Sequence, residues 1–419
     1  MEDEHDIDAL SVELHDELRA HAGEGWSSKQ SPSAKTHQNS APEYSEQSKQ
    51  IIRALHEGMA DPDCSQIDGY GPARFSAQFQ GDQRLLEGLA FSNETEYVSW
   101  LKHIVDDANA VTTWEHIQEA RMGVLNLRDG GRLTIFLPPV ATGGKPTFSL
   151  RKHVARNFSH MDFVDRGVLS AAMMDFLRSC VAAHVNILFV GPMGSGKTTL
   201  LRSLAEVFAD NEKIAVVEQI PEIHIAKPLV VERVYQPNVE GMRLADVLDY
   251  ELYDGLQRLI VGEVHLDGLT KMLETFITVE GSMSTYHAFS TEQAGERMKV
   301  GLLRENTMTA QTAISYMKQA IELVVVMETL NGQRRVTQIT EIDWRSSGGR
   351  EVFGGTDLFQ YDHAHQRHIP TGNQPDPNGN IMFKMTNKHN IPLHRHWFIN
   401  QEQVAALQRA SEDAARYGR

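Results

Sequence analysis

The residues with the clearest chemical meaning form a short glycine-rich stretch in the middle of the chain. The pattern G-x-x-x-x-G-K-[ST] is matched in full by Gly191-Pro192-Met193-Gly194-Ser195-Gly196-Lys197-Thr198. Glycines at these places let backbone amides turn inward around phosphate oxygens, and the lysine supplies a point charge to the β and γ phosphates. The threonine offers its hydroxyl to Mg²⁺. The motif therefore predicts a bound nucleoside triphosphate with magnesium.

The segments on either side of this loop have the patterns of a strand entering it and a helix leaving it. Val185–Val190 is an almost wholly apolar run, and a helical pattern continues from about Thr198 through Thr199 and Leu200. The amino-terminal end of such a helix carries a partial positive charge that favours an anion. A plain glycine-rich turn has no need of this context, so we interpret the loop as a phosphate site.

Three further strand-like runs end in residues that could act on the phosphates. Leu259–Val261 leads to Glu263, which could hold Mg²⁺ through water or polarise the attacking water. Another run ends at Glu218, our alternative general base, with Glu222 as a weaker candidate. A run of small residues ends at His287, which could donate to the γ-phosphate and report its presence. Taken alone, the histidine would more often be a satisfied core residue.

Composition narrows the class of protein. Lys and Arg number 40 and Asp and Glu number 56, for a net charge of −16, which disfavours general nucleic-acid binding. Only two cysteines, Cys64 and Cys180, are present, which excludes a disulfide framework and a four-cysteine zinc site and fits a reduced, cytoplasmic compartment. The acidic start Met1–Asp6 is no signal peptide, and the apolar runs are too short to cross a bilayer. Any membrane contact is therefore expected through partners.

The pattern along the chain predicts an α/β protein in four parts. Strand–helix alternation in the middle indicates a mainly parallel sheet with helices on both faces. The leading apolar stripe Ile7, Leu10, Leu14 and Leu18 either folds back on the body or docks a partner. We expect a short helix and disordered tether over 1–48, a smaller α+β amino-terminal domain over 49–158, a P-loop domain over 159–345, and a C-terminal β-rich extension and helix over 346–419.

Within the C-terminal part, strand-like pieces are expected at Thr356–Tyr361 and Ile381–Met385, and a terminal helix at Gln401–Arg416.

A dozen blocks in this order resemble the type II/IV secretion ATPases, nearest to the CpaF/TadA branch of pilus and tight-adherence motors and close to the VirB11 group. The resemblance runs from roughly residue 65 to 365. Besides the loop and the acids, it rests on Gly69–Arg74, Asp129-Gly130-Gly131-Arg132, Pro138-Pro139, Thr147–Lys152, Pro237–Gly241, Gly262-Glu263-Val264, Gly281–His287 and Arg335–Ile342.

The resemblance implies a RecA-like motor domain that assembles as a hexameric homo-oligomer. It implies ATP and Mg²⁺ held between the amino-terminal domain and the motor domain. It implies that His287 is functional and that Arg132 and Arg151 reach the phosphates, as guanidinium forks can. It further implies a place at the cytoplasmic face of the membrane, with an inner-membrane platform or secretion-channel proteins as partners.

The predicted site residues fall into three groups. The catalytic residues are Glu263, Glu218, His287 and Lys197. The magnesium ligands are Thr198 and Glu263. The nucleotide-binding residues are Gly191, Pro192, Met193, Gly194, Ser195, Gly196, Lys197, Thr198, Thr199, Arg132, Arg151 and Glu222.

Some positions depart from the family's pattern. His265 stands where an arginine is usual, Gln219 where an aspartate is usual, and Leu252–Gln257 lacks the usual Arg and Pro-Asp. These departures leave the rate of hydrolysis and the inter-subunit arginine contacts open, and they allow a slow or specialised motor. Two alternatives remain. One is a nucleic-acid translocase on the same RecA-like core, and the other, supported by these departures, is a nucleotide-binding scaffold subunit with little turnover.

Overall fold

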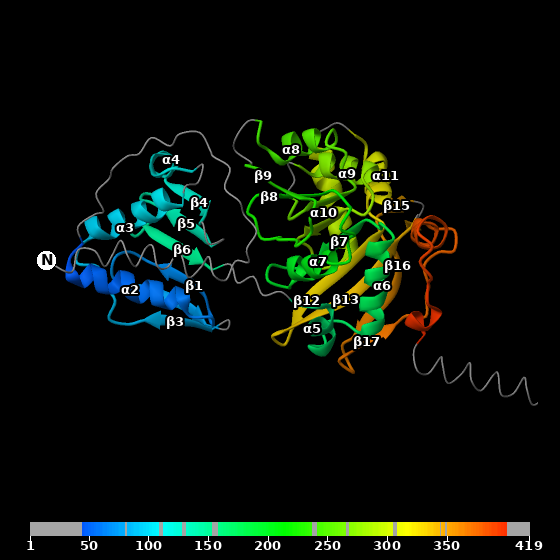
Figure 1. The fold of residues 1–419 in the computed structure, drawn as a ribbon, viewed down its shortest axis with the longest axis horizontal. Helices are drawn as coiled ribbons and strands as arrows, with labels where there is room; N and C mark the ends of the chain where they lie inside the picture. Colours follow the sequence, from blue (N-terminus) through cyan, green and yellow to red (C-terminus); the bar gives the residue numbers. More distant parts are fainter. Residues whose placement is uncertain are drawn as a thin grey trace, which may run out of the picture. The chain divides into compact units, whose positions relative to one another are not determined.

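The computed structural model has two compact units, Met1–Ala155 and Arg156–Arg419, each with its own hydrophobic core (Figure 1). The predicted helices in 1–22 and 401–416 lie outside the described residues. None of the described helices combines the length and the apolar character that crossing a bilayer requires. The residues described are 44–79, 82–108, 112–127, 131–152, 158–236, 241–264, 268–304, 308–343, 345–347 and 350–399.

The first unit packs its described helices against a six-stranded sheet whose neighbouring strands are all antiparallel. The strand order is β3-β2-β1-β6-β5-β4. The elements are α2 (Glu46–Ala60), β1 (Cys64–Gly69), β2 (Phe75–Phe79), β3 (Asp82–Leu86), α3 (Glu94–Asp107), α4 (Trp114–Ala120), β4 (Met122–Asn126), β5 (Arg132–Phe136) and β6 (Thr147–Arg151).

Alternation along the strands separates the two faces of this sheet. Leu133 and Ile135 of β5 are buried in the core, whereas Thr134 between them points to the other face. Trp100 of α3 meets Phe148 of β6 edge-on, with ring centroids 5.3 Å apart, and so closes the apolar side. The opposite face carries polar side chains such as Thr134 and Ser149, together with exposed Met122, Val124 and Phe136.

Helix α2 begins earlier than the sequence analysis predicted. The tether was expected to run to residue 48, but the helix starts at Glu46, and its N-cap Ser45 accepts a hydrogen bond from the amide of Ser48. Ile51 and Leu55, four residues apart, are buried in the core of the first unit. A capping serine ahead of this apolar spacing starts a helix even inside a polar stretch.

The second unit contains a nine-stranded sheet in the order β17-β16-β13-β12-β7-β11-β10-β8-β9. Strands from β12 to β9 in that order run parallel to their neighbours, and β13, β16 and β17 are added antiparallel. The elements are α5 (His160–Asp165), α6 (Ala171–Ala182), β7 (Ile187–Val190), α7 (Lys197–Ala205), β8 (Ile214–Glu218), β9 (Val230–Val234), α8 (Leu244–Glu251), β10 (Arg258–Val261), α9 (Leu269–Thr278), β11 (Met283–Tyr286), α10 (Thr291–Arg304), α11 (Ala310–Ala320), β12 (Leu323–Leu330), β13 (Gln333–Ile342), β14 (Arg345–Ser347), β15 (Arg350–Val352), β16 (Gly355–Asp362), β17 (Arg367–Pro370) and α12 (Asn380–Met382).

Helices cover both faces of the nine-stranded sheet, as a mainly parallel sheet requires. In β7, Ile187 and Phe189 belong to the core that includes α6 and α7, and Leu188 and Val190 belong to the core that includes α8 to α11. The four strands predicted around the site are present as β7, β8, β10 and β11. The predicted class, mixed α/β with a mainly parallel sheet, is therefore confirmed.

One predicted strand is wrong. The expected strand at Ile381–Met385 is helical, because α12 continues into a π-helical turn over Phe383–Lys388. Ile381 and Met385 are both buried, whereas Phe383 between them is exposed. A strand would place all three side chains on one face, and a helix groups only the residues four apart.

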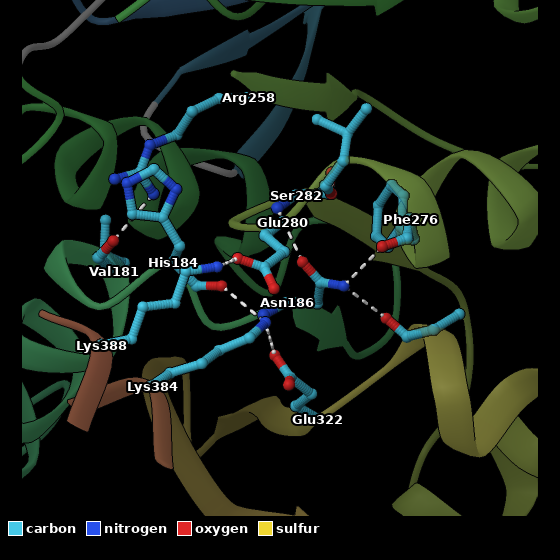
Figure 2. A network of polar contacts seen from close by, with 12 residues as sticks. Val181, His184, Asn186, Arg258, Phe276, Glu280, Ser282, Glu322, Lys384 and Lys388 are labelled. Carbon is cyan, nitrogen blue, oxygen red and sulfur yellow. Dashed lines mark hydrogen bonds and ion pairs between the residues drawn. The ribbon is translucent and has the colours of Figure 1, made fainter. Parts of the chain in front are cut away.

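A buried polar network fixes this C-terminal segment to the second unit (Figure 2). Lys384 Nζ lies 2.7 Å from Glu322 Oε2 and donates to the carbonyl of His184 at 2.9 Å. Glu322 also accepts a hydrogen bond of 2.8 Å from the amide of Asn186. The Asn186 side chain donates to two backbone carbonyls and accepts from one backbone amide. Since Asn186 precedes β7 and Glu322 precedes β12, the network joins the segment to the amino ends of neighbouring strands.

We expect Lys384→Ala to lower the free energy of unfolding of the full chain by about 3 kcal/mol or more, because it leaves Glu322 buried without its charged partner. The control Lys388→Ala breaks the more exposed pair of Lys388 with Glu280 and should cost less than about 1 kcal/mol. Urea unfolding followed by circular dichroism measures both. Equal losses would contradict the importance of the buried pair.

Candidate nucleotide-binding site

The glycine-rich loop connects the carboxyl end of β7 to the amino end of α7. The strand ends at Val190 and the helix begins at Lys197, one residue earlier than predicted. Gly194 and Gly196 have φ values of +77° and +97°, which other L-residues rarely adopt. Gly196 is also the N-cap of α7, so the free amides of the first helical turn adjoin the loop. The backbone has the form that an anion-binding turn requires.

Polar groups inside the loop fit a phosphate ligand. Lys197 is 6 % exposed, and its Nζ donates to the carbonyls of Gly191 and Pro192 at 2.9 Å each. Burial lowers the pKa of Lys197 to about 8, against the opposing attraction of Glu263. The buried Ser195 Oγ has no hydrogen-bond partner among the described residues. Phosphate oxygens would satisfy both the ammonium and the hydroxyl.

Glu263 and His287 lie at the same edge of the sheet as the loop. Strand β11 pairs in parallel with β7 on one side and with β10 on the other, so residues that follow these strands come together. His287 Nε2 lies 3.0 Å from Glu263 Oε1. His287 Nδ1 lies 3.2 Å from the carbonyl oxygen of Gly191 and 3.4 Å from Lys197 Nζ. A carboxylate, an imidazole and an ammonium therefore form a continuous row beside the loop.

Glu218 is the buried acid of this edge. It ends β8, is 6 % exposed, and accepts hydrogen bonds from the backbone amides of Glu222 and Ile223. Burial raises the pKa of Glu218 to about 7, although the two amides favour the charged form. A Cβ at Gly262 would come within 2.7 Å of Glu218 Cγ, so this glycine makes room for the acid. Glu218 thus packs against the residue that precedes Glu263.

The other predicted residues of this unit lie around the loop. Thr198 and Thr199 are half-buried in the first turn of α7. Met193 is 79 % exposed, so it contributes to the loop through its backbone. The amide of Glu222 binds Glu218, and its own carboxylate is close enough to Arg202 of α7 to act on it electrostatically. Glu222 therefore takes part mainly by shaping the surroundings of Glu218.

Arg132 and Arg151 are direct neighbours in the first unit. Strands β5 and β6 pair with Arg132 opposite Arg151, and Gln66 and Asn126 flank the two arginines on either side. Residues opposite one another share a face of the sheet, so both arginine side chains start from the same face. Like charges in this position destabilise a sheet, and an anion between them would relieve the repulsion. The phosphate loop belongs to the other unit, so a contact of these two arginines with the bound phosphates stays a prediction.

Three further parts of the chain that the sequence analysis named lie outside the described residues. They are the turn residues Asp129 and Gly130, the segment 237–240, and His265.

Sequence reasoning missed an arginine that lies against the loop. Arg334 of β13 donates from Nε to the carbonyl of Gly194 at 3.0 Å. It reaches the loop because β12 and β13 form a hairpin, whose turn residues Asn331 and Gly332 both have positive φ. An Asn-Gly pair between strand-like runs is a strong hairpin signal, so the turn was predictable although the contact was not.

Comparison with known proteins identifies the family of this chain. Residues 106–349, more than half of the chain, match the sequence profile of the family described as "Type II/IV secretion system protein". The chain is 25 % identical over 313 residues to the probable conjugal transfer protein TrbB of Sinorhizobium fredii, covering 72 % of this chain and 93 % of that protein. It is 25 % identical over 267 residues to the type IV secretion system protein VirB11 of Bartonella quintana, covering 54 % and 73 %.

Two solved structures support the fold. The pilus retraction motor PilT with bound ADP has a TM-score of 0.51 at 16 % identity, covering 73 % of this chain and 83 % of that chain. The Legionella pneumophila ATPase DotB has a TM-score of 0.50 at 15 % identity, covering 88 % and 98 %. The predicted RecA-like fold of the second unit is therefore confirmed. The match to the family profile covers more than half of the chain and includes the phosphate loop. The chain therefore belongs to the type II/IV secretion system protein family, the secretion ATPases that its motifs resemble.

Proposed function

We propose that this chain is the ATPase subunit of a ring motor that drives pilus assembly, conjugation or protein secretion. The observation that carries the proposal is the meeting of Lys197, His287 and Glu263 beside the phosphate loop. Relatives named for conjugal transfer and for type IV secretion support the type of machine. The CpaF/TadA branch within the family stays a prediction.

ATP would bind with its phosphates in the loop between β7 and α7. The inward-turned amides and the Lys197 ammonium would hold the β and γ phosphates, and Ser195 Oγ would gain a partner. Magnesium, when bound, would neutralise charge on the phosphate oxygens. The Thr198 hydroxyl and Glu263, the latter through water, would hold it. Both residues are accessible to solvent in part.

Hydrolysis would depend on the acids at this edge of the sheet. Glu263 would polarise the attacking water, oriented by its contact with His287. Glu218 would assist, and its pKa of about 7 is close to the pH at which a general base is most effective. His287 lies between Glu263 and Lys197, so it would donate to the γ-phosphate and lose that contact when the phosphate leaves.

The first unit would complete the site with its arginine pair. Arg132 and Arg151 stand opposite each other on neighbouring strands, and their guanidinium groups would suit a phosphate chain. Hydrolysis would then move the first unit against the second. In a hexameric ring at the cytoplasmic face of the membrane, this movement would push an inner-membrane platform or secretion-channel protein.

Two measurements separate this proposal from its alternatives. Activity stimulated by DNA and suppressed by salt would indicate a nucleic-acid translocase, against which the net charge of −16 argues. Nucleotide binding of ordinary affinity without phosphate release would indicate a scaffold subunit.

We expect Lys197→Ala to lower ATP turnover by about 10²-fold or more, because the loop loses the charge that stabilises the transferring phosphate. Phosphate release with Mg-ATP measures the effect. The control Lys227→Ala removes a lysine paired with the exposed Asp210 and should leave turnover unchanged. Equal turnover in wild type and Lys197→Ala would refute the site.

Glu263→Gln should retain ATP binding but lower kcat by about 10²-fold, since an amide cannot activate water as a carboxylate does. Calorimetry gives the affinity and phosphate release gives kcat. Glu274→Gln, an acid of α9 paired with Lys271, serves as the control. If Glu263→Gln turned over normally while Glu218→Gln did not, Glu218 would be the principal base instead.

The pKa of Glu218 predicts how activity changes with pH. Below about pH 7 the raised pKa keeps this acid protonated and unable to accept a proton, so kcat/KM should fall about tenfold for each pH unit on the acid side. Turnover measured from pH 5.5 to 8.5 tests the profile. In Glu218→Gln the activity should be lower and this acid limb should disappear. An unchanged acid limb in that variant would exclude the assisting role.

A further inference from the structure

Strand β12 continues to Leu330, beyond the carboxyl end of β7 where the phosphate loop begins. Strand β12 runs parallel beside β7, with Val326 opposite Val190. The next residue, Met327, therefore adjoins Gly191, where the loop begins. A Cβ at Gly191 would come within 2.2 Å of the Met327 carbonyl oxygen, which shows how closely the hairpin approaches.

One side chain of this hairpin contacts both left-handed glycines of the loop. Arg334 Nε donates to the carbonyl oxygen of Gly194 at 3.0 Å. A Cβ at Gly196 would lie 3.1 Å from Arg334 Cδ and 3.5 Å from Met327 Cε. The aliphatic part of the Arg334 side chain thus packs over Gly196, while its Nε bonds to the carbonyl of Gly194.

The hairpin that presents Arg334 is itself attached to the rest of the unit. The amide of Val336 donates to the carbonyl of Val168 at 2.7 Å, and Arg335 Nη1 donates to the carbonyl of Arg166 at 3.3 Å. Successive residues of a strand point to opposite sides, so Arg335 reaches the turn after α5 while Arg334 reaches the loop. The donor to Gly194 is therefore carried by a supported strand.

We propose that Arg334 is a positioning residue of the nucleotide site, which acts on the substrate through the backbone of the loop. Gly194 is exposed and has no side chain of its own, so the hydrogen bond from Arg334 to its carbonyl helps to hold this part of the loop in place. A loop already held in its binding form has less conformational entropy to lose when a triphosphate enters. The inference rests on the proposed function, since it concerns the same loop.

Two substitutions separate the hydrogen bond from the charge. Arg334→Gln keeps an amide N–H the same number of bonds from the backbone as Nε but removes the guanidinium charge. Arg334→Met keeps a similar length without any donor. We expect Arg334→Met to raise the Kd for ADP about tenfold and to raise KM for ATP by a similar factor, with kcat unchanged. In Arg334→Gln, both Kd and KM should stay within about threefold of wild type. Calorimetry and steady-state turnover measure these values.

Controls make the test specific. The melting temperature should be unchanged in both variants, because Arg334 is exposed. Arg367→Ala, which removes an exposed arginine of β17 in the same sheet, should leave Kd unchanged. Wild-type binding in Arg334→Met would overturn the inference. A Kd in Arg334→Gln as weak as in Arg334→Met would also overturn it, since the charge and not the bond to Gly194 would then matter. A wild-type chain that bound no nucleotide would overturn the proposed function, and the inference with it.

Discussion

The candidate site depends on the parallel pairing of β7 between β11 and β12. Four residues, Ile187–Val190, are enough for this strand because both neighbours supply backbone hydrogen bonds and both of its faces are buried. The pairing aligns three chain segments at one edge: the loop after β7, His287 after β11, and Met327 within β12. A shift of one residue in either pairing would turn every side chain of β7 to the opposite face, so the register is tightly specified.

Buried charged groups lie at both edges of this sheet, and those at the amino edge form a close ion pair. At the amino edge, Lys384 and Glu322 neutralise each other at 2.7 Å, which suits a structural role. At the carboxyl edge, burial lowers the pKa of Lys197 and raises that of Glu218, so these groups are held away from their ordinary protonation behaviour. Perturbed groups gathered in one place are typical of functional sites. The contrast supports assigning chemistry to the loop edge.

The parts of the fold that the sequence predicted best are those with local signals. The strand before Gly191 and the strands ending near Glu218 and Glu263 were found because short apolar runs followed by glycine or acid identify buried parallel strands. The order of the strands could not be predicted from the sequence, because the strands beside β7, β11 and β12, come from distant segments of the chain. The helix at Ile381–Met385 was misread because a spacing of four fits both periods. Arg334 was missed because its contact joins residues 140 positions apart.

The burial of Lys384 has an evolutionary consequence. The family's sequence profile ends at residue 349, yet Ile381, Met385 and Phe398 complete the core around Phe176. A premature stop codon or a protease cut at that point would remove Lys384 from Glu322 and would uncover the apolar side chains around Phe176. Because a buried acid without its charged partner is costly, we expect relatives that keep this segment to keep the lysine and the acid as a pair.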